Sequence, residues 1–292
     1  MMKLTPEFVK KLLPLHPSDS HKGDYGHTLV VAGSKQFTGA AVLCSLGCIR
    51  CGSGLTTVAM PSSLNIQITR RLPPEVMTVY LPDNDGYISP TSTKTIFDFS
   101  SQRKITSIAF GCGISVELCT KIFTKRFLLK NRVPIVIDAD GLNNIQKNVE
   151  IFKKMKSDVI ITPHPAELSR LMKVGIFDIQ KNRKKIVKKF AAKHGLICVL
   201  KGFETVISDG KEIFVNTTGN PGMATGGSGD VLTGMIAAFI GQTKNLLDAV
   251  CLGVYLHGVA GDLAAKEKTQ ISMLPTDLVE KIPEAIKMVL SA

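Results

Sequence analysis

The segment Gly219–Asp230 contains the residue types best suited to chemistry, because its glycines, small hydroxyls and single carboxylate directly precede an apolar stretch at 231–240. That stretch predicts a helix. At a helix start, free backbone N–H groups and the positive end of the helix dipole favour an anion, and glycines let it approach closely. A carboxylate there makes sense if Asp230 takes a proton from a group beside the anion. The segment therefore predicts phosphoryl-transfer chemistry.

The same segment also has a purely structural interpretation. Asp is a favoured residue at helix starts, and glycine-rich turns are common in loops. However, Thr225 and Ser228 lie among the glycines of this short run. This concentration of small and hydroxyl-bearing residues favours a functional anion site.

Two further candidate site residues are Lys201, which follows a strand-like run, and His164, which stands between two prolines. Lys201 closes the apolar run 196–200, where it is either a surface residue at a strand end or a phosphate contact through its flexible ammonium group. His164 stands between Pro163 and Pro165, which restrict the backbone. It is either a buried histidine with satisfied hydrogen bonds or a rigidly presented ligand contact.

Three carboxylates complete the set of candidates. Glu167 is either an acid in the first turn of a helix or a residue that binds Mg²⁺ through water. Asp138 and Asp140 occupy alternate positions at a strand end and look like a carboxylate pair. The same positions would also suit the capping of the following turn, so their role stays open.

Short apolar, β-branched runs alternate with helix-like runs along most of the chain. Such a pattern predicts an α/β fold with a mostly parallel sheet covered on both faces, and ligands bind such sheets beyond the carboxyl ends of the strands. No linker or repeat is found, so we expect a single domain over 1–292. The predicted strands are 28–32, 56–60, 76–80, 107–110, 134–138, 159–162 and 197–200, with a hairpin at 205–208 and 212–215; the predicted helices are 39–51, 116–129, 166–172, 179–194, 231–240, 246–266 and 276–290.

Composition narrows the class of protein. The net charge of +12 indicates a partner of opposite sign, but no nucleic-acid motif accompanies the basic stretch 180–193, which we interpret as a solvated helix face. The cysteines, Cys44, Cys48 and Cys51 among them, lack further metal ligands and are expected to be buried and reduced. No secretory signal and no apolar window long enough to cross a bilayer is found. We therefore expect a cytoplasmic protein without membrane or nucleic-acid partners.

Motifs along nearly the whole chain resemble those of the NAD(P)H-hydrate dehydratases of the ribokinase-like superfamily. The resemblance implies a three-layer sandwich with a mostly parallel central sheet flanked by helices. It also implies an enzyme that uses ADP or ATP with Mg²⁺, ADP being favoured, to dehydrate the S-epimer of hydrated NADH or NADPH. The ring hydroxyl would be phosphorylated and phosphate then eliminated. The motifs are 20–27, 32–34, 37–41, 52–55, 138–143, 162–167, 201–202 and 220–230.

The resemblance further implies roles for individual residues. Asp230 would be the catalytic base and a substrate contact, beside an anion hole formed by Gly227, Ser228 and Gly229. No residue is assigned to a metal. Contacts to the hydrated dinucleotide would also come from Ala40, Gly113 and His164, and contacts to the adenine nucleotide from Lys201, Gly202, Phe203, Glu204, Thr205 and Gly229.

Other functions stay open on sequence alone. A kinase of the same superfamily, acting on a thiazole- or pyrimidine-type alcohol, would leave a stable phosphate ester. A nucleotide sensor would bind without turnover, and the presence of Asp230 counts against it. A dinucleotide-dependent oxidoreductase is disfavoured, because 32–34 lacks a Gly-x-Gly-x-x-Gly fingerprint.

The resemblance also bears on assembly and partners. Many relatives carry a fused N-terminal domain that epimerises the hydrated cofactor, and no segment of this chain is long enough for it. We therefore expect a separate NAD(P)H-hydrate epimerase to act in the same pathway. The family resemblance favours a homotetramer.

Overall fold

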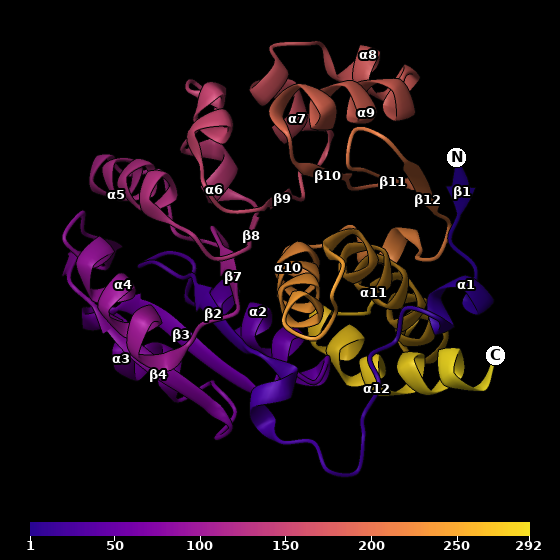
Figure 1. The fold of residues 1–292 in the computed structure, drawn as a ribbon, viewed down its shortest axis with the longest axis horizontal. Helices are drawn as coiled ribbons and strands as arrows, with labels where there is room; N and C mark the ends of the chain where they lie inside the picture. The colour runs from indigo at the N-terminus through magenta and orange to yellow at the C-terminus, as the bar shows by residue number, and fades with distance from the viewer.

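The computed structural model describes residues 1–292 and arranges ten strands in one sheet between layers of helices (Figure 1). Neighbouring strands are parallel except at β11, which runs antiparallel to both of its neighbours. A small hairpin, β5 and β6, lies outside this sheet. Across the sheet the order is β1 (Met2–Lys3), β12 (Ile213–Asn216), β11 (Thr205–Ser208), β10 (Ile197–Leu200), β9 (Val159–Ile161), β8 (Ile135–Ile137), β7 (Ser107–Phe110), β2 (His27–Val31), β3 (Leu55–Pro61) and β4 (Val76–Leu81), and the hairpin is β5 (Asp83–Asn84) and β6 (Tyr87–Ile88).

The helices form two layers over separate apolar cores. On one face the long C-terminal helices pack with α2, and on the other the helices between β4 and β10 cover the sheet (Figure 1). The first layer contains α1 (Pro6–Lys10), α2 (Thr38–Arg50), α3 (Asn65–Thr69), α10 (Ser228–Ile240), α11 (Leu246–Lys268) and α12 (Pro275–Ser291); the second contains α4 (Ser92–Arg103), α5 (Leu118–Lys130), α6 (Asp140–Asn143), α7 (Pro165–Met172), α8 (Ile176–Lys181) and α9 (Arg183–His194). Four short 3₁₀ turns complete the chain: η1 (Lys22–Tyr25), η2 (Ser62–Leu64), η3 (Val149–Lys154) and η4 (Pro221–Met223).

The central strands are buried on both faces, as their continuous apolar sequence predicts. In β2, Val30 enters one core while Leu29 and Val31 enter the other. Successive side chains of a strand point to opposite faces, so a strand covered on both sides needs an apolar residue at every position. The predicted α/β architecture with a mostly parallel sheet flanked by helices is confirmed.

Several predicted boundaries differ from the structure. The predicted helix 179–194 is two helices, α8 and α9, which meet at Asn182. Helix α4 was not predicted, because its polar sequence carries little apolar periodicity; Ile96 is the side chain that anchors it in the core. Strand β1 was also missed, since two residues pairing with β12 leave no pattern in the sequence.

Helix α11 corrects the expectation that no segment is apolar and long enough to cross a bilayer. By length and composition Leu246–Lys268 meets that requirement. Within the protein, however, 72% of its most apolar window is buried, in contact with α10 and α12. Its apolar sequence is therefore used in packing against these two helices.

Candidate active site

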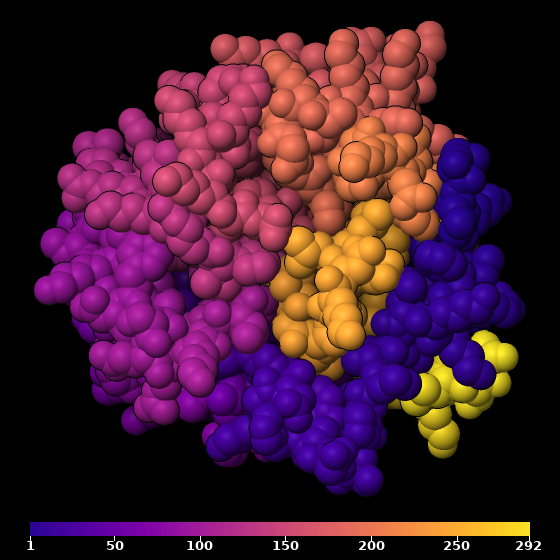
Figure 2. Space-filling model, in the orientation of Figure 1, coloured from indigo at the N-terminus to yellow at the C-terminus, as the bar shows by residue number.

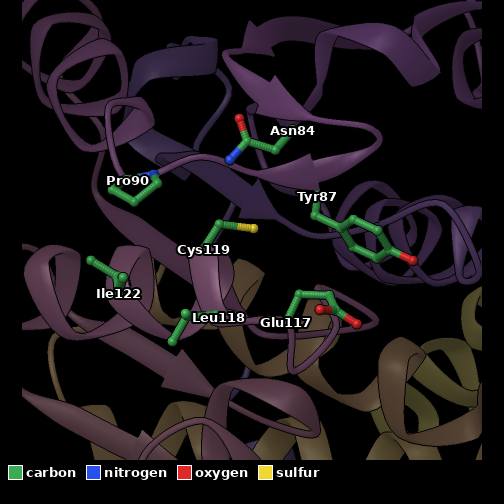
Figure 3. Close-up of a pocket in the computed structure, with 7 residues that line it drawn as sticks. All are labelled: Asn84, Tyr87, Pro90, Glu117, Leu118, Cys119 and Ile122. Carbon is green, nitrogen blue, oxygen red and sulfur yellow. The ribbon is translucent and has the colours of Figure 1, made fainter.

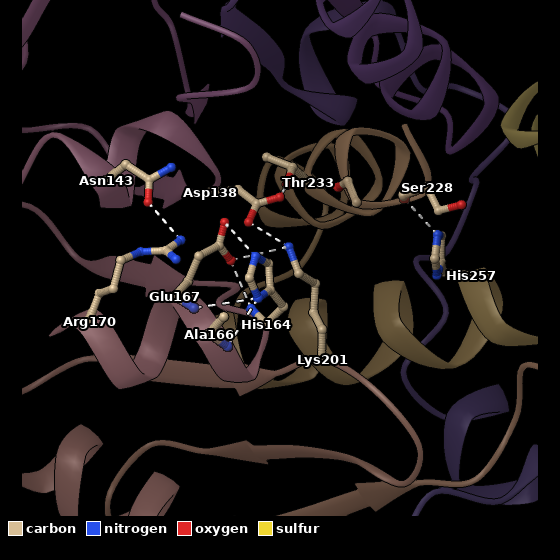
Figure 4. Close-up of polar contacts among 11 residues, drawn as sticks. Asp138, Asn143, His164, Ala166, Glu167, Arg170, Lys201, Ser228, Thr233 and His257 are labelled. Carbon is tan, nitrogen blue, oxygen red and sulfur yellow. Dashed lines mark hydrogen bonds and ion pairs between the residues drawn. The ribbon is translucent and has the colours of Figure 1, made fainter. Parts of the chain in front are cut away.

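Four candidate side chains gather at one edge of the sheet (Figure 4). Asp138 follows β8, His164 and Glu167 follow β9 at the start of α7, and Lys201 follows β10. These strands are parallel neighbours, so their carboxyl ends meet at the same edge. The first turn of α10 lies against Lys201 at that edge. The sequence therefore located this cluster correctly.

The glycine-rich turn presents unpaired amide groups toward this edge. Gly227 has a φ of 105° and allows the chain to turn into α10 at Ser228. The backbone N–H groups of Gly227, Gly229 and Asp230 donate to no backbone or side-chain acceptor, and the buried hydroxyl of Ser228 has no hydrogen-bond partner. These donors, at the positive end of a helix, suit an anion.

Gly229 is the point of closest approach between this turn and the charged side chains. A Cβ atom at Gly229 would lie 3.2 Å from Lys201 Nζ and 3.4 Å from Asp138 Oδ2. At Gly227 a Cβ atom would lie only 2.5 Å from Leu43 of α2. A side chain would crowd Lys201 at Gly229 and Leu43 at Gly227, so both positions favour glycine.

Lys201 is held between two carboxylates. Its Nζ atom lies 2.6 Å from Asp138 Oδ1 and 4.0 Å from Glu167 Oε2. Burial lowers the pKa of Lys201, but the two carboxylates outweigh this effect and the pKa is raised overall. Burial also raises the pKa of Glu167, and the charge of Lys201 offsets part of that effect. Lys201 therefore carries a positive charge at neutral pH.

Asp230 has the pKa expected of a carboxylate that exchanges protons near neutrality. Burial is the largest effect and, with the negative charges of Asp138 and Asp140, it raises the pKa of Asp230 to about 7. A hydrogen bond from Cys112 and the charge of Lys201 act in the opposite direction. A base is most effective when its pKa lies near the working pH, so Asp230 is well suited to that role.

Asp138 and Asp140, the two aspartates that follow β8, do not form a pair. Asp138 is turned into the charged cluster, where Thr233 of α10 donates to its Oδ2 atom at 2.9 Å. Asp140 instead accepts the backbone N–H of Ser115 at 2.9 Å and the side-chain amide of Asn143 at 3.2 Å. The sequence left open whether these residues form a carboxylate pair or cap the following turn. In the structure Asp140 supports the local turn, and Asp138 faces the site.

His164 is fixed by the start of α7. Its Nδ1 atom accepts the backbone N–H of Ala166 at 3.1 Å and that of Glu167 at 3.4 Å, and the backbone N–H of His164 donates to Glu167 Oε2 at 2.8 Å. Burial, then the charges of Lys201 and Arg170, lower the pKa of His164, so the ring is neutral at pH 7. The side chain is still 46% exposed, which leaves it accessible to a ligand.

Ala40 and Gly113 lie next to each other on neighbouring turns. Ala40 is in the first turn of α2, and Gly113 follows β7 with a φ of 61°. A Cβ atom at Gly113 would lie 2.8 Å from that of Ala40 and 2.6 Å from that of Phe37. The structure therefore brings together these two predicted substrate contacts.

The predicted nucleotide segment is a tight connection from β10 to β11. Gly202 and Glu204 both have positive φ, 120° and 51°, and Thr205 donates to the carbonyl of Gly202 at 2.9 Å. Arg183 of α9 donates to the carbonyl of Lys201 at 3.2 Å. Phe203 is 91% exposed. This turn holds its backbone rigidly while leaving one aromatic ring free in solvent.

Two residues of the site were missed from the sequence. His257 of α11 contacts the carbonyl of Ser228 through Nε2 at 2.9 Å, and burial lowers the pKa of His257 to about 4, so the neutral ring donates this hydrogen bond. Thr233 contacts Asp138 from the second turn of α10. A lone histidine in an apolar helix carries no signal, whereas a hydroxyl four residues after Gly229 could have been considered.

No group of three or more His, Cys, Asp or Glu side chains is arranged to hold a metal ion. Asp138 and Glu167 supply oxygen atoms near the anion-binding turn, but both already face the ammonium of Lys201. Mg²⁺ commonly binds through one or two carboxylates together with substrate phosphates and waters. The residues present therefore fit a Mg²⁺ ion held largely by the phosphates of a nucleotide.

A cavity of about 530 Å³ lies elsewhere, between the β5–β6 hairpin and the start of α5 (Figure 3). It shares no residue with the cluster around Lys201. Its one charged side chain, Glu117, is acidic, and no lysine, arginine or histidine lines it to bind a phosphate. The chemistry of this lining does not favour a phosphate site. Its lining consists of Asn84, Tyr87, Pro90, Glu117, Leu118, Cys119 and Ile122.

A mostly parallel sheet whose carboxyl edge faces the free amides of a glycine-rich helix start is the arrangement of the ribokinase-like fold. A ribokinase-like superfamily protein from Enterococcus faecalis has the same fold, with a TM-score of 0.84 and 28% identity over all of this chain and 97% of that one. The sequence profile of the NAD(P)H-hydrate dehydratase family matches residues 28–284. The chain belongs to this family.

Individual relatives agree with that assignment. The ADP-dependent (S)-NAD(P)H-hydrate dehydratase of Listeria monocytogenes is 31% identical over 99% of this chain and 97% of its own length. The crystal structure of the ADP/ATP-dependent NAD(P)H-hydrate dehydratase from Bacillus subtilis, co-crystallised with ATP and Mg²⁺, has a TM-score of 0.83 and 31% identity, covering 98% of this chain and 97% of that one.

A second group of relatives is longer. The bifunctional NAD(P)H-hydrate repair enzyme of Moorella thermoacetica is 37% identical over 97% of this chain, but the match covers only 53% of that protein. The chain thus spans about half the length of the bifunctional relatives that it matches.

Proposed function

We propose that this protein restores hydrated NADH or NADPH to the active coenzyme, using ADP or ATP as phosphoryl donor. The observation that carries the proposal is the position of Asp230, a carboxyl with a pKa of about 7, directly among the free amides that begin α10. A base and an anion site in one helix turn suit transfer of a phosphoryl group to a hydroxyl.

The proposed reaction has two steps. Asp230 takes the proton of the ring hydroxyl while the oxygen attacks the terminal phosphorus of the nucleotide, whose bridging oxygen leaves with AMP or ADP. The C–O bond of the phosphate ester then breaks, because the electron pair of the ring nitrogen expels inorganic phosphate. Loss of a proton from the adjacent carbon restores the ring double bond. The products are the nucleotide shortened by one phosphate, phosphate and NADH or NADPH.

The other roles follow the positions of the residues. We assign the anion hole to Gly227, Ser228 and Gly229, whose unpaired donors support this assignment. Ala40, Gly113, His164 and Asp230 would contact the hydrated dinucleotide. The rigid turn from Lys201 to Thr205, together with Gly229, would contact the adenine nucleotide.

The wider setting is also proposed. The family favours ADP as donor with Mg²⁺ bound to its phosphates, and relatives are named as ADP-dependent enzymes. We propose one catalytic domain over 1–292, a homotetrameric assembly and a cytoplasmic location. The bifunctional relatives support a functional partnership with an NAD(P)H-hydrate epimerase.

The test is the recovery of NADH absorbance when hydrated NADH is incubated with the protein, Mg²⁺ and either ADP or ATP. Recovery that needs one nucleotide and releases inorganic phosphate is expected, and it identifies the donor. Absence of recovery with both nucleotides would refute the proposed reaction. Formation of a stable phosphate ester from an alcohol substrate would instead identify a kinase.

A further inference from the structure

Asp138 is one of the two carboxylates whose role the sequence left open. In the structure its side chain joins two separate parts of the site. Its side chain is 1% exposed. Oδ1 receives the ammonium of Lys201 at 2.6 Å, and Oδ2 receives the hydroxyl of Thr233 at 2.9 Å. Lys201 stands at the end of β10, where the nucleotide segment begins, whereas Thr233 belongs to α10. Both oxygens of one buried carboxylate are therefore used to connect the two elements (Figure 4).

Thr233 extends this connection to the anion-binding turn. Its side chain is fully buried, and its hydroxyl lies 3.0 Å from the carbonyl of Gly229, one helical turn earlier. Gly229 itself leaves space for the cluster, because a Cβ atom there would stand 3.4 Å from Asp138 Oδ2. The chain of contacts thus runs from Lys201 through Asp138 and Thr233 to the backbone of the turn.

The charges explain why such a link is needed. The ammonium of Lys201 lies against the N-terminal turn of α10, and the positive end of a helix repels a cation. The carboxylate of Asp138, placed between them, offsets this repulsion. Without it, the ammonium is expected to move away from the turn, and the preorganised spacing between the lysine and the amides would be lost.

We propose that Asp138 and Thr233 are positioning residues that hold Lys201 and the amides of the anion-binding turn at a fixed separation for phosphoryl transfer. This inference rests on the proposed function, because it takes Asp230 as the base and the turn as the anion hole. Preorganised donors contribute to catalysis only when their geometry is set before the reaction. Asp138 and Thr233 fix this geometry of the donors without contacting the substrate.

Thr233→Val tests the link from within α10, because valine keeps the size of threonine and removes the hydroxyl. Thr233→Ser is the matched control, since it keeps the hydroxyl. With ADP and hydrated NADH, kcat of the valine variant is expected to fall about tenfold or more while the serine variant stays within about threefold of the wild type. Equal kcat in the valine variant and the wild type, measured on folded protein of matched concentration, would overturn the proposal.

Asp138→Asn adds a readout that a purely structural role would not change. The titratable groups that interact with Asp230 are Asp138, Asp140, Lys201, Cys112 and the buried thiol of Cys44. Removing the charge of Asp138 removes a cause that raises the pKa of Asp230, so the acidic limb of the kcat profile is expected to move to lower pH. An unmoved limb together with an unchanged kcat would contradict the proposal. A large rise in the Mg²⁺ concentration for half-maximal activity would also contradict it, by assigning Asp138 to metal binding.

The experiment separates failure of this inference from failure of the proposed function. If the wild-type protein restores no NADH absorbance with either nucleotide, the proposed function fails first and the positioning role falls with it. If the wild type is active and the valine and asparagine variants match it in kcat and pH profile, only the positioning role is wrong.

Discussion

The imidazole of His257 donates through Nε2 to the carbonyl of Ser228 at 2.9 Å, and so connects the middle of α11 to the first residue of α10. Burial lowers the pKa of His257 to about 4, which keeps the ring neutral in the working range of the protein. The contact comes from a helix that carries no other residue of the site. The anion-binding turn is therefore held by a hydrogen bond from the core helix α11 as well as by the charged cluster around Lys201.

Replacement of His257 is expected to loosen this support. His257→Phe leaves the carbonyl of Ser228 without its partner, at a cost of about 1–3 kcal/mol in the free energy of unfolding. His257→Gln, which keeps an N–H donor, should lose less. Chemical denaturation of both variants checks this order, and equal stability of the phenylalanine variant and the wild type would contradict it.

The same histidine predicts a dependence of stability on acid. The unfolded chain binds a proton at the usual pKa of histidine, about 6.5, whereas the folded protein resists protonation of His257 down to about pH 4. The stability contribution is therefore complete above pH 6.5 and is lost as the pH falls toward 4. Melting temperatures measured across this range should fall more steeply for the wild type than for His257→Gln. Parallel curves would show that another group controls the effect.

Asp230 should set the acidic limb of the reaction. Because burial and two neighbouring carboxylates raise the pKa of Asp230 to about 7, kcat is expected to rise as the pH increases through that value. Asp230→Asn keeps the shape of the side chain and removes the base, so kcat should fall about 10²–10⁴-fold. Steady-state rates of NADH recovery at several pH values measure both effects, and turnover near that of the wild type would refute the base assignment.

Asp230 also affects the free energy of unfolding. Raising the pH is expected to lower this stability, whereas it is expected to increase kcat. Its folded-state pKa lies above the value for an unfolded chain, so its contribution to stability is fully present below the usual pKa of aspartate and is lost as the pH rises through about 7. Asp230→Asn is therefore expected to melt at a higher temperature than the wild type at alkaline pH, with a difference that shrinks in acid. Differential scanning fluorimetry over the pH range measures this difference. A lower melting temperature of Asp230→Asn than of the wild type at alkaline pH would contradict the prediction.

Two glycines of the turn provide a matched pair of substitutions. A Cβ atom at Gly229 would lie 3.2 Å from Lys201 Nζ, whereas one at Gly226 would have no atom within 4 Å. Gly229→Ala should disturb the separation between lysine and amides and lower kcat about 10²-fold. Gly226→Ala should lower it by less than about threefold. Equal losses in the two variants would show that crowding at Gly229 is not the cause.

Phe203 offers a test of the nucleotide segment with little effect on folding. The ring is 91% exposed, so Phe203→Ala should leave the melting temperature unchanged. If the segment binds the adenine nucleotide, its KM should rise several-fold. Phe177→Ala is the control, because Phe177 is 77% exposed on α8 outside the site. A change in nucleotide KM that is the same in both variants would argue against a specific contact at Phe203.

Much of this protein was predictable from local sequence. Continuous apolar runs such as 28–32 mark strands buried on both faces, because every side chain of such a strand must enter one of two cores. The glycine-rich run before 231–240 marks the start of α10, because free amides and flexible backbone occur together there. The parallel arrangement then brings Asp138, His164 and Lys201 to one edge, since parallel strands share the direction of their carboxyl ends.

Other features depended on contacts between distant segments. The polar helix α4 is held by the burial of Ile96 in the core, with Phe97 and Phe99 packed against it, although its own sequence shows little apolar periodicity. Asp138 and Asp140 stand two residues apart after one strand, yet one faces Lys201 and the other the backbone of Ser115. A sequence specifies which residues alternate along a strand end, but not which partners arrive there from other elements.

The amino-acid sequence by itself therefore predicted the α/β architecture, the family and the candidate residues of the site. Only the tertiary structure decided how those residues are held. The hydrogen bond from Thr233 to Asp138 joins residues 95 positions apart, and that from His257 to Ser228 joins two different helices. Such contacts depend on how α10 and α11 pack against the sheet, and no periodicity or spacing within one segment encodes that packing.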